Sequence, residues 1–368
     1  MKISGVNVYQ VKGRGWPKYA WIWVEVNTDE GITGIGESAP VDGVVEALTK
    51  LGRKITGENP FNIEKIFEES VRSGSFLPAI SGIEMALWDI IGKKLGTPIY
   101  NLLGGKCHEK LRVYLDGFFR GAAYTPGEYA EKAKIAVEQG FTAIKVDIDP
   151  PQIPSLHRLN RDLDLADIHL TVNVVKAVRK AIGDDVDFAV DTHGSFNPSS
   201  MIKLAKLLEP YNLMWIEDPV PRYGSNIKTL AKLTAEINIP VCVGEHLFTR
   251  ADFREVFELG ATDLIMPDIC YTGGILEMKK IASMADAYHI PYCPHNYLGP
   301  ISSMASIQAC TCAPNFVILE FQGGDVPWRD DVLSEPVPLK NGFIEIPTKP
   351  GLGVELNKDE LTKHLVTS

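Results

Sequence analysis

Three acidic residues recur along the chain at nearly equal intervals, each at the end of a short apolar run. Asp191, Glu217 and Glu245 stand 26 and 28 residues apart, which is close to the length of one strand-plus-helix unit in a parallel α/β barrel. Carboxylates that converge from neighbouring strands repel one another unless a cation lies between them. An all-oxygen ligand set favours Mg²⁺ over Zn²⁺ or Ca²⁺, and the nearby imidazoles of His193 and His246 leave Mn²⁺ open. The pattern therefore predicts a divalent-metal site.

Ionisable side chains end the other predicted strands at the same interval. Asp268 and His295 should end adjacent strands, where a carboxylate bonded to one ring nitrogen raises the basicity of the imidazole, so this pair is a candidate general base. In VDTHGSF, Asp191 and His193 are two residues apart, and a strand would point both to the same side. One such acid or histidine is more often a helix cap or a structural residue, but recurrence at seven strand ends favours a functional ring. Its further members are Lys145, Asp147 and Glu320.

Eight short apolar runs alternate with amphipathic helical segments between residues 111 and 322. Eight such units in about 210 residues fit a closed α/β fold, the (β/α)8 barrel, whose active site lies at the C-terminal ends of its strands. A doubly wound open sheet is the alternative, but no G-x-G-x-x-G follows the first run. The runs are LRVYLDG, AIKVDID, FAVDTHG, MWIEDP, VCVGEH, LIMPDI, PYCPHN and VILEF.

The flanking segments predict a second, smaller unit. Residues 1–110 contain alternating runs that indicate strands, followed by three helical stretches, and so predict an α+β capping domain. Residues 111–322 would form the barrel, and residues 323–368 are expected to return to the capping domain with PGLGVEL as a strand.

The turn between the first two strands should lie over the barrel mouth and contact the substrate, although it could equally anchor a hairpin. Its candidate residues are Trp16, Lys18 and Tyr19. A long connection after the second barrel strand resembles a lid and carries His157, whose role stays undecided. His246 follows Glu245 directly, so a regular strand would point it away from the lumen, whereas a twisted strand end would bring it near the substrate.

Composition limits the class of protein. With 368 residues, 45% of them apolar, the chain can bury the cores of two domains. A net charge of −10 argues against a nucleic-acid or anionic-membrane surface. No apolar run reaches the roughly 18 residues of a membrane span, and MKISGVNVYQ does not resemble a signal peptide. The six cysteines form no C-x-x-C pair, so we expect buried thiols in a cytoplasmic protein.

Taken together, these residues resemble the enolase superfamily and, within it, the mandelate-racemase-like group of acid-sugar dehydratases. The resemblance covers essentially the whole chain. It implies a modified barrel with a capping domain, one Mg²⁺ per subunit, a small sugar-acid substrate and a homo-oligomer, either a dimer or an octamer. Its landmarks are GIGES at 34–38, ALWDIIGKKLGTPIYNLLGG at 86–105, IKVD at 144–147, VDTHG at 190–194, WIEDP at 215–219, GEH at 244–246, PDICYTGG at 267–274, PHN at 294–296 and PGLGVEL at 350–356.

The resemblance also implies roles for the ring. His193 is similar to the general acid of gluconate- and galactonate-dehydratase-like members, and Glu320 is similar to the acid that binds a substrate carboxylate oxygen. Lys145 would share in stabilising the negative charge that develops on that carboxylate. The implied metal ligands are Asp191, Glu217 and Glu245, and the implied general base is the His295–Asp268 dyad.

One position departs from the racemases of this group, which carry K-x-K on the second barrel strand and use the second lysine as a base. Here that position is Asp147, which disfavours racemisation unless Lys145 takes the role, and K-x-D is similar to gluconate dehydratase.

The implied reaction starts when His295 removes the C2 proton of an aldonate such as D-gluconate or D-galactonate. His193 then protonates the 3-hydroxyl, and the product is a 2-keto-3-deoxy acid. The alternatives are a racemase or epimerase of the same superfamily, a metal-dependent barrel hydrolase, and a non-catalytic sugar-acid-binding protein.

Overall fold

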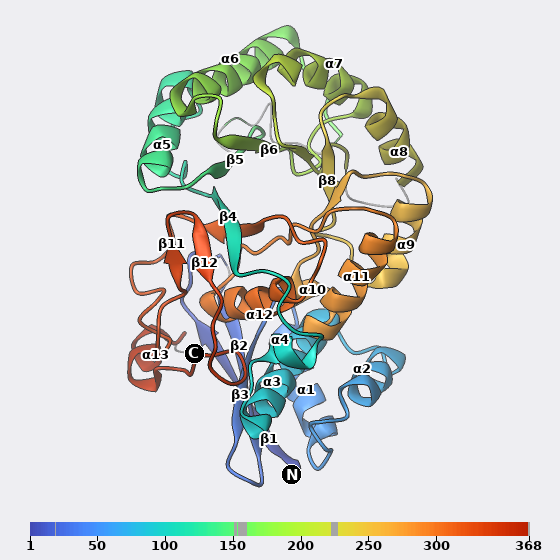
Figure 1. Ribbon diagram of the computed structural model, residues 1–368, viewed down its shortest axis with the longest axis vertical. Helices are drawn as coiled ribbons and strands as arrows, with labels where there is room; N and C mark the ends of the chain where they lie inside the picture. Colours follow the sequence, from blue (N-terminus) through green and yellow to red (C-terminus); the bar gives the residue numbers. More distant parts are fainter. Residues whose placement is uncertain (19, 151–152, 154–159, 222–226, 367–368) are drawn as a thin grey trace.

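The computed structural model describes the chain except for a few short stretches (Figure 1). The residues outside the description are 19, 151–152, 154–159, 222–226 and 367–368. Tyr19, His157 and the greater part of the predicted lid therefore lie outside the described residues. Within the described part, no helix is both long and apolar enough to span a bilayer.

The N-terminal part is a three-stranded antiparallel sheet of order β1-β2-β3 with helices against it. Its close packing explains GIGES, because a Cβ on Gly34 or Gly36 would come within 2.0 or 1.9 Å of the carbonyl oxygens of Ala86 or Gly82 on α3. Only glycine allows the strand to lie this near the helix. The elements are β1 (Ile3–Val11), β2 (Trp21–Thr28), β3 (Thr33–Ser38), α1 (Val44–Ile55), α2 (Ile63–Arg72), α3 (Leu77–Leu95) and α4 (Ile99–Leu102).

A closed parallel barrel follows, and Figure 1 shows helices α5 to α9 around its outer side. Six strands pair side by side in chain order. Residues 291–295 occupy the seventh strand position through parallel bridges of Tyr292, and the last strand closes the barrel by pairing with the first. The strands are β4 (Lys110–Asp116), β5 (Ala143–Asp147), β6 (Asp187–Asp191), β7 (Ile216–Glu217), β8 (Val241–Val243), β9 (Leu264–Ile265) and β10 (Leu319–Gln322). The helices are α5 (Pro126–Glu138), α6 (Leu165–Ile182), α7 (Pro198–Leu208), α8 (Ile227–Glu236), α9 (Arg250–Glu258), α10 (Ile269–Thr272), α11 (Ile275–Ala287) and α12 (Pro300–Thr311).

The barrel predicted from the sequence is thus confirmed, with one modification. After β10 the chain does not add another outer helix; among residues 323–366, all of them described, the one helix is α13 (Lys358–His364). This segment forms β11 (Leu339–Lys340) and β12 (Phe343–Glu345), which extend the sheet at β4. Its end then pairs with the capping part through the Val11–Leu365 bridge.

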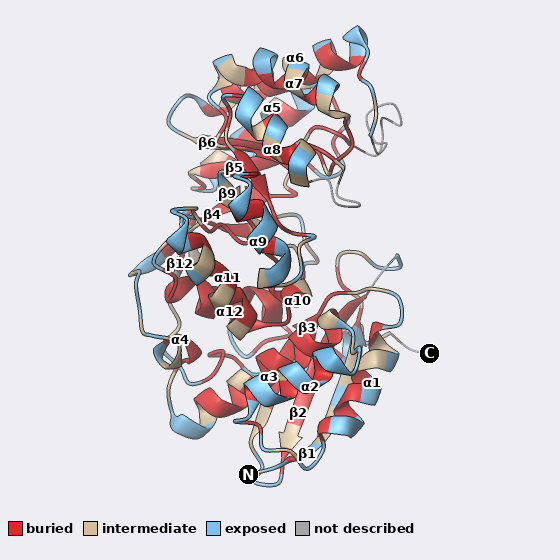
Figure 2. Cartoon of the chain, turned by 90° about the vertical axis from the view of Figure 1, so that its right-hand side faces the viewer, coloured by how far each residue is buried: buried red, intermediate tan, exposed pale blue. Residues whose placement is uncertain are grey.

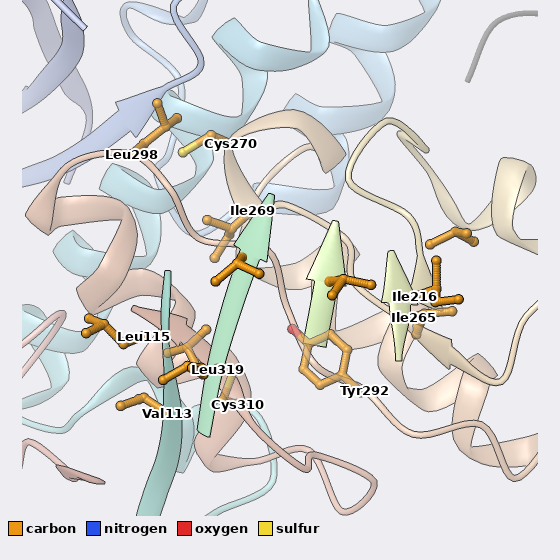
Figure 3. Packing of buried hydrophobic residues seen from close by; sticks show 14 of the residues in the cluster. Val113, Leu115, Ile216, Ile265, Ile269, Cys270, Tyr292, Leu298, Cys310 and Leu319 are labelled. Carbon is orange, nitrogen blue, oxygen red and sulfur yellow. The ribbon is translucent and has the colours of Figure 1, made fainter. Parts of the chain in front are cut away.

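The barrel interior is closed by a layer to which each of the eight strand positions contributes one side chain. The aromatic rings of Tyr114 and Trp215 meet edge to face at 5.3 Å and fill its centre. Val113 and Leu115, on either side of Tyr114, lie on the opposite face and pack toward the surrounding elements (Figure 3). The layer consists of Tyr114, Ala143, Ala189, Trp215, Cys242, Met266, Cys293 and Ile318. It forms a solid floor beneath the barrel mouth.

Two buried carboxylates join the capping part to the barrel. Glu37, in β3, accepts hydrogen bonds of 2.8 Å from the backbone N–H groups of Gly299 and Ser302 at the start of α12. Glu84, in α3, accepts bonds of 2.7 and 3.0 Å from Ile275 and Leu276 at the start of α11. Neither barrel helix has a side-chain cap from its own N-cap residue. The capping part therefore satisfies backbone donors that these helices leave unpaired (Figure 2 shows this contact region as buried).

Burial sets the proton affinity of these joints. It raises the pKa of both Glu37 and Glu84 to about 7, although the helix N–H groups act in the opposite direction.

All six cysteine thiols are free, and five of them are buried.

The Glu84 joint should make stability depend on pH. In the folded state the pKa of Glu84 is about 7, above its ordinary value of 4.5. The protonated carboxyl therefore stabilises the fold fully below the pKa of the unfolded state, and this stabilisation is lost as the pH rises through 7. Glu84→Gln carries no such proton. From pH 5 to 8 the variant should therefore gain up to about 3 kcal/mol relative to the parent, as measured by urea unfolding. Glu68→Gln, at an exposed position, should show no such trend, and a pH-independent difference for Glu84→Gln would contradict the account.

Candidate active site at the barrel mouth

Three carboxylates meet at the C-terminal ends of neighbouring barrel strands. Asp191 and Glu217 are the last residues of β6 and β7, and Glu245 follows β8 after Gly244. All three are buried, and each offers an oxygen within 4.8 Å of the others. The structure thus brings together the three acids whose spacing predicted a metal site.

Lys145 in β5 compensates only part of this charge. Its Nζ lies 2.7 Å from Glu217 Oε1, 3.6 Å from Asp191 Oδ2 and 3.5 Å from Glu320 Oε1. Burial lowers the pKa of Lys145, but Glu217 and Glu320 outweigh it and hold this pKa well above its ordinary value. Burial and the charges of Asp191 and Glu245 raise the pKa of Glu217 well above its ordinary value, although Lys145 acts against the rise. Three convergent carboxylates form an all-oxygen ligand set, which fits a hard divalent cation.

The predicted imidazole–carboxylate pair forms at the seventh strand position. His295 Nδ1 lies 2.8 Å from Asp268 Oδ2, and the two backbones form a parallel bridge. The other ring nitrogen, Nε2, lies 3.0 Å from Glu245 Oε2. Burial lowers the pKa of His295, but Glu245, Glu320 and the bond to Asp268 carry it well above its ordinary value. His295 is therefore held by one nitrogen and faces the carboxylate cluster with the other.

A second imidazole–carboxylate pair stands across the barrel. His193 Nδ1 lies 2.8 Å from Asp149 Oδ1, and its Nε2 lies 3.4 Å from Asp191 Oδ2. Strand β6 ends at Asp191, and His193 adopts a left-handed φ of 45° that lets its backbone N–H donate to Asp191 Oδ1. Asp191 and His193 thus lie together, as expected, although through a turn and not through strand alternation. Burial lowers the pKa of His193, but Asp191, Asp147 and Asp149 raise it well above its ordinary value.

Asp149 was missed in the sequence, although a signal for it existed. Lys145, Asp147 and Asp149 are each two residues apart in IKVDID, and the alternation of a strand would place all three on one face. Asp147 lines the cavity, and burial raises its pKa to about 8 while His193 acts against the rise. Asp147, Asp191 and His193 also form a second group whose ligand atoms lie within 4.8 Å of one another.

Glu320 in β10 completes the ring beside Lys145. Its Oε2 accepts a 2.7 Å bond from the backbone N–H of Asn296, and its Oε1 accepts one of 2.7 Å from Gln322 Nε2. Burial raises the pKa of Glu320 although Lys145 and His295 act against the rise. A carboxyl group that holds its proton can donate a hydrogen bond to a substrate oxygen.

Two arginines that the sequence did not single out lie at one side of the cavity. Arg14, from the β1–β2 connection, and Arg120, after β4, both donate to Gln322 Oε1. Gln322 Nε2 also donates to Asp116 Oδ2 at 2.7 Å. Burial raises the pKa of Asp116, but Lys145 and Arg120 outweigh it and hold this pKa at about 2. The cavity measures about 280 Å³ and combines donors and acceptors, as recognition of hydroxyl groups requires. Its lining is Arg14, Asp116, Arg120, Lys145, Asp147, Asp191, His193, Glu245, His246, Tyr271, His295, Tyr297 and Glu320.

Two of the residues predicted to contact the substrate from the β1–β2 connection do not line the cavity. Trp16 and Lys18 are exposed and are not among the lining residues, whereas Arg14 of the same connection is. Of the two orientations considered for His246, the structure has the one expected of an irregular strand end, since His246 lines the cavity with Nε2 3.1 Å from Glu245 Oε1. The reason is local. Strand β8 ends at Val243, and Gly244, with a φ of 140°, breaks the alternation.

Comparison with known proteins gives two family matches. Residues 14–104 match the N-terminal domain of mandelate racemase and muconate lactonizing enzyme, and residues 128–360 match the enolase C-terminal domain-like family. A D-xylonate dehydratase of Haloferax volcanii is 38% identical over 99% of this chain and 89% of its own. A D-gluconate dehydratase of Thermoproteus tenax is 32% identical over 95% of this chain and 70% of its own. A solved mandelate racemase/muconate lactonizing enzyme structure from Sulfitobacter sp. is 32% identical, has a TM-score of 0.92 and covers 100% of this chain and 96% of its own.

A divalent cation should stabilise the folded protein through the three-carboxylate cluster. Binding to the folded chain alone at 100 times the dissociation constant adds about 2.7 kcal/mol to stability. Glu245→Gln removes one ligand and should lose most of the rise in Tm that Mg²⁺ or Mn²⁺ causes in a thermal-unfolding titration. Asp147→Asn alters only the second group and should keep that rise. A full rise in Glu245→Gln, or its loss in Asp147→Asn alone, would place the ion elsewhere.

Proposed function

Since the chain belongs to the mandelate racemase/muconate lactonizing enzyme family of the enolase superfamily, we propose that it is a metal-dependent acid-sugar dehydratase. This hydro-lyase would remove the C2 proton and the 3-hydroxyl of an aldonate to give a 2-keto-3-deoxy acid. One observation carries the proposal. His193 and His295 stand at the third and seventh of eight strand positions, on opposite sides of the barrel, and each ring binds a buried aspartate and faces the carboxylate cluster.

Asp191, Glu217 and Glu245 would hold the cation, which we propose is Mg²⁺, with Mn²⁺ as a substitute. When bound, the ion supplies positive charge for the substrate carboxylate as that group gains electron density. The support is the all-oxygen ligand set, in which the three carboxylates each offer an oxygen within 4.8 Å of the others.

His295 is the proposed base. Glu245 is the main cause of the raised pKa of His295, and a cation held by Glu245 would offset that charge and favour the neutral ring. With Nδ1–H donating to Asp268, the neutral ring has its lone pair on Nε2, which can take the C2 proton. A positioned base contributes about 10²–10⁴-fold, roughly 3–5 kcal/mol, whereas enzymes lower barriers by about 8–23 kcal/mol. The remainder would come from stabilising the charge of the ene-diolate on the carboxylate oxygens, to which Lys145 would donate, together with Glu320 when it holds a proton.

His193 is the proposed acid. It gives the proton on Nε2 to the 3-hydroxyl, the C3–O bond breaks, and one water leaves. The resulting enol becomes the 2-keto-3-deoxy acid. The hydrogen from C2 and the hydroxyl from C3 account for the water that is lost overall.

A racemase or epimerase is the second candidate, and the residues on β5 disfavour it. Lys145 has a raised pKa, so its ammonium lacks the lone pair that a base needs. Asp147, with a pKa of about 8, is protonated at neutral pH and cannot serve as a strong base there.

The cavity supports a polyhydroxy monoacid as the substrate. Arg14 and Arg120 would donate to the distal hydroxyls of a pentonate or hexonate, and the acceptors near them argue against a second carboxylate.

We also propose that the enzyme is cytoplasmic, on the basis of its free thiols, and homo-oligomeric. For the latter, the support is an apolar groove lined by Trp88 and Leu102, in which Phe61 and Leu95 are 42% and 54% exposed.

Turnover against a panel of aldonic and aldaric acids with Mg²⁺ tests the function. We expect 2-keto acid to form from at least one aldonate, with one water lost per turnover, and aldarates to react at least tenfold more slowly. Exchange of C2 configuration without water loss would instead identify an epimerase. Inertness towards all polyhydroxy acids, with binding retained, would identify a binding protein.

The two imidazoles should separate the two halves of the reaction. His295→Asn should abolish exchange of the C2 hydrogen with deuterated solvent and also water loss, because both need the base. His193→Asn should lower water loss by about 10²–10⁴-fold while C2 exchange continues, because only elimination needs the acid. Proton NMR of the recovered substrate measures exchange. Full exchange in His295→Asn, or parental water loss in His193→Asn, would remove that residue from its role.

A further inference from the structure

Asp149 lies behind His193 and outside the cavity lining. It is 1% exposed, and it follows β5 by two residues. Its Oδ1 lies 2.8 Å from His193 Nδ1, and its Oδ2 accepts a 2.6 Å bond from Ser195 Oγ. A buried carboxylate with both oxygens engaged in this way holds the imidazole by a fixed hydrogen bond.

The arrangement matches that of the base on the opposite side of the barrel. In both dyads the Nδ1-to-carboxylate distance is 2.8 Å. In both, Nε2 faces an oxygen of the three-carboxylate cluster, at 3.4 Å for His193 and 3.0 Å for His295. Asp149 therefore stands to His193 as Asp268 stands to His295.

The Asp149 carboxylate determines which nitrogen of the His193 ring carries hydrogen. An ionised carboxylate only accepts, so the proton in the Nδ1 bond belongs to the ring, and Nε2 is the nitrogen turned to the cavity. An imidazole that delivers a proton from Nε2 must carry hydrogen on both nitrogens beforehand. Such a ring needs an acceptor at Nδ1, and Asp149 is that acceptor.

We propose that Asp149 is a positioning residue for the elimination step, an inference that rests on the proposed dehydratase function. It fixes the His193 ring so that the Nε2–H bond breaks as the new O–H bond forms on the 3-hydroxyl. The C3–O electron pair then leaves with the water, and the electrons of the ene-diolate form the C2–C3 double bond. Asp149 has no part in removal of the C2 proton, which takes place at His295.

Asp149→Asn tests this, and Ser195 sets the orientation of the new amide. With the amide oxygen in the place of Oδ2, as the acceptor for Ser195 Oγ, the amide NH₂ faces His193. Nδ1 must then accept and cannot carry hydrogen. The ring keeps its place but loses the doubly protonated form.

With the Mg²⁺-loaded protein and the best aldonate of the panel, Asp149→Asn should lower water loss by about 10²–10⁴-fold. C2 exchange in deuterated solvent should fall by less than tenfold, so the ratio of exchange to elimination rises at least tenfold. Asp268→Asn, the matched change across the barrel, should lose exchange and elimination together. Ser195→Ala, which leaves the bond from His193 to Asp149, should keep the parental ratio.

Nitrogen-15 NMR of the ring gives a readout that needs no turnover. In the parent, His193 Nδ1 should carry hydrogen, and in Asp149→Asn it should not, with the signals identified by their loss in His193→Asn. If Asp149→Asn lowers exchange and elimination by one common factor, or leaves Nδ1 protonated, the inference is overturned. If the parent neither exchanges nor dehydrates any acid, the proposed function fails, and the NMR result still decides whether Asp149 sets the form of the ring.

Discussion

Charge repulsion among three buried carboxylates is the constraint on which the rest of this structure depends. Asp191, Glu217 and Glu245 bring oxygens within 4.8 Å of one another, and the ammonium of Lys145 lies 2.7 Å from Glu217 and 3.6 Å from Asp191. Burying unpaired charge costs several kcal/mol per ion, so a fold keeps such a cluster only when a cation or a proton offsets it. Burial and the neighbouring carboxylates Asp191 and Glu245 raise the pKa of Glu217, and the proposed divalent ion would offset their charge.

The barrel holds the cluster in place through both its floor and its rim. Trp215, in the interior layer, donates from its indole to Glu217 at 3.2 Å, and Lys145 lies over the ring of Tyr114 in the same layer. Around the rim, the two imidazoles are each fixed from behind by a buried aspartate. Sites held by strands and by hydrogen bonds of this kind keep their geometry without help from the ligand. The capping part is tied to the same barrel through the starts of α11 and α12, so Arg14 reaches the cavity from a fixed position.

The regular features of the molecule could be predicted from the sequence, and the irregular ones could not. The period of the strand ends identified the ring from Lys145 to Glu320 because parallel barrel strands all end on one side. The orientation of His246 stayed open because it depends on one glycine at the end of β8, which breaks the alternation. Arg14 meets Gln322 across 308 positions of sequence, and no local pattern encodes such a contact. Glu37 and Glu84 were missed as joints for the same reason, and the domain boundaries at 110 and 322 stay predictions.

A crystal structure of the Mg²⁺-loaded protein with an unreactive aldonate analogue tests the central claim most directly. The account predicts one ion coordinated by oxygens of Asp191, Glu217 and Glu245 at about 2.0–2.1 Å. C2 of the analogue should then lie within reach of His295, and its 3-hydroxyl within reach of His193. An ion held instead by Asp147, Asp191 and His193, or an analogue with both imidazoles on the same side of its chain, would contradict it.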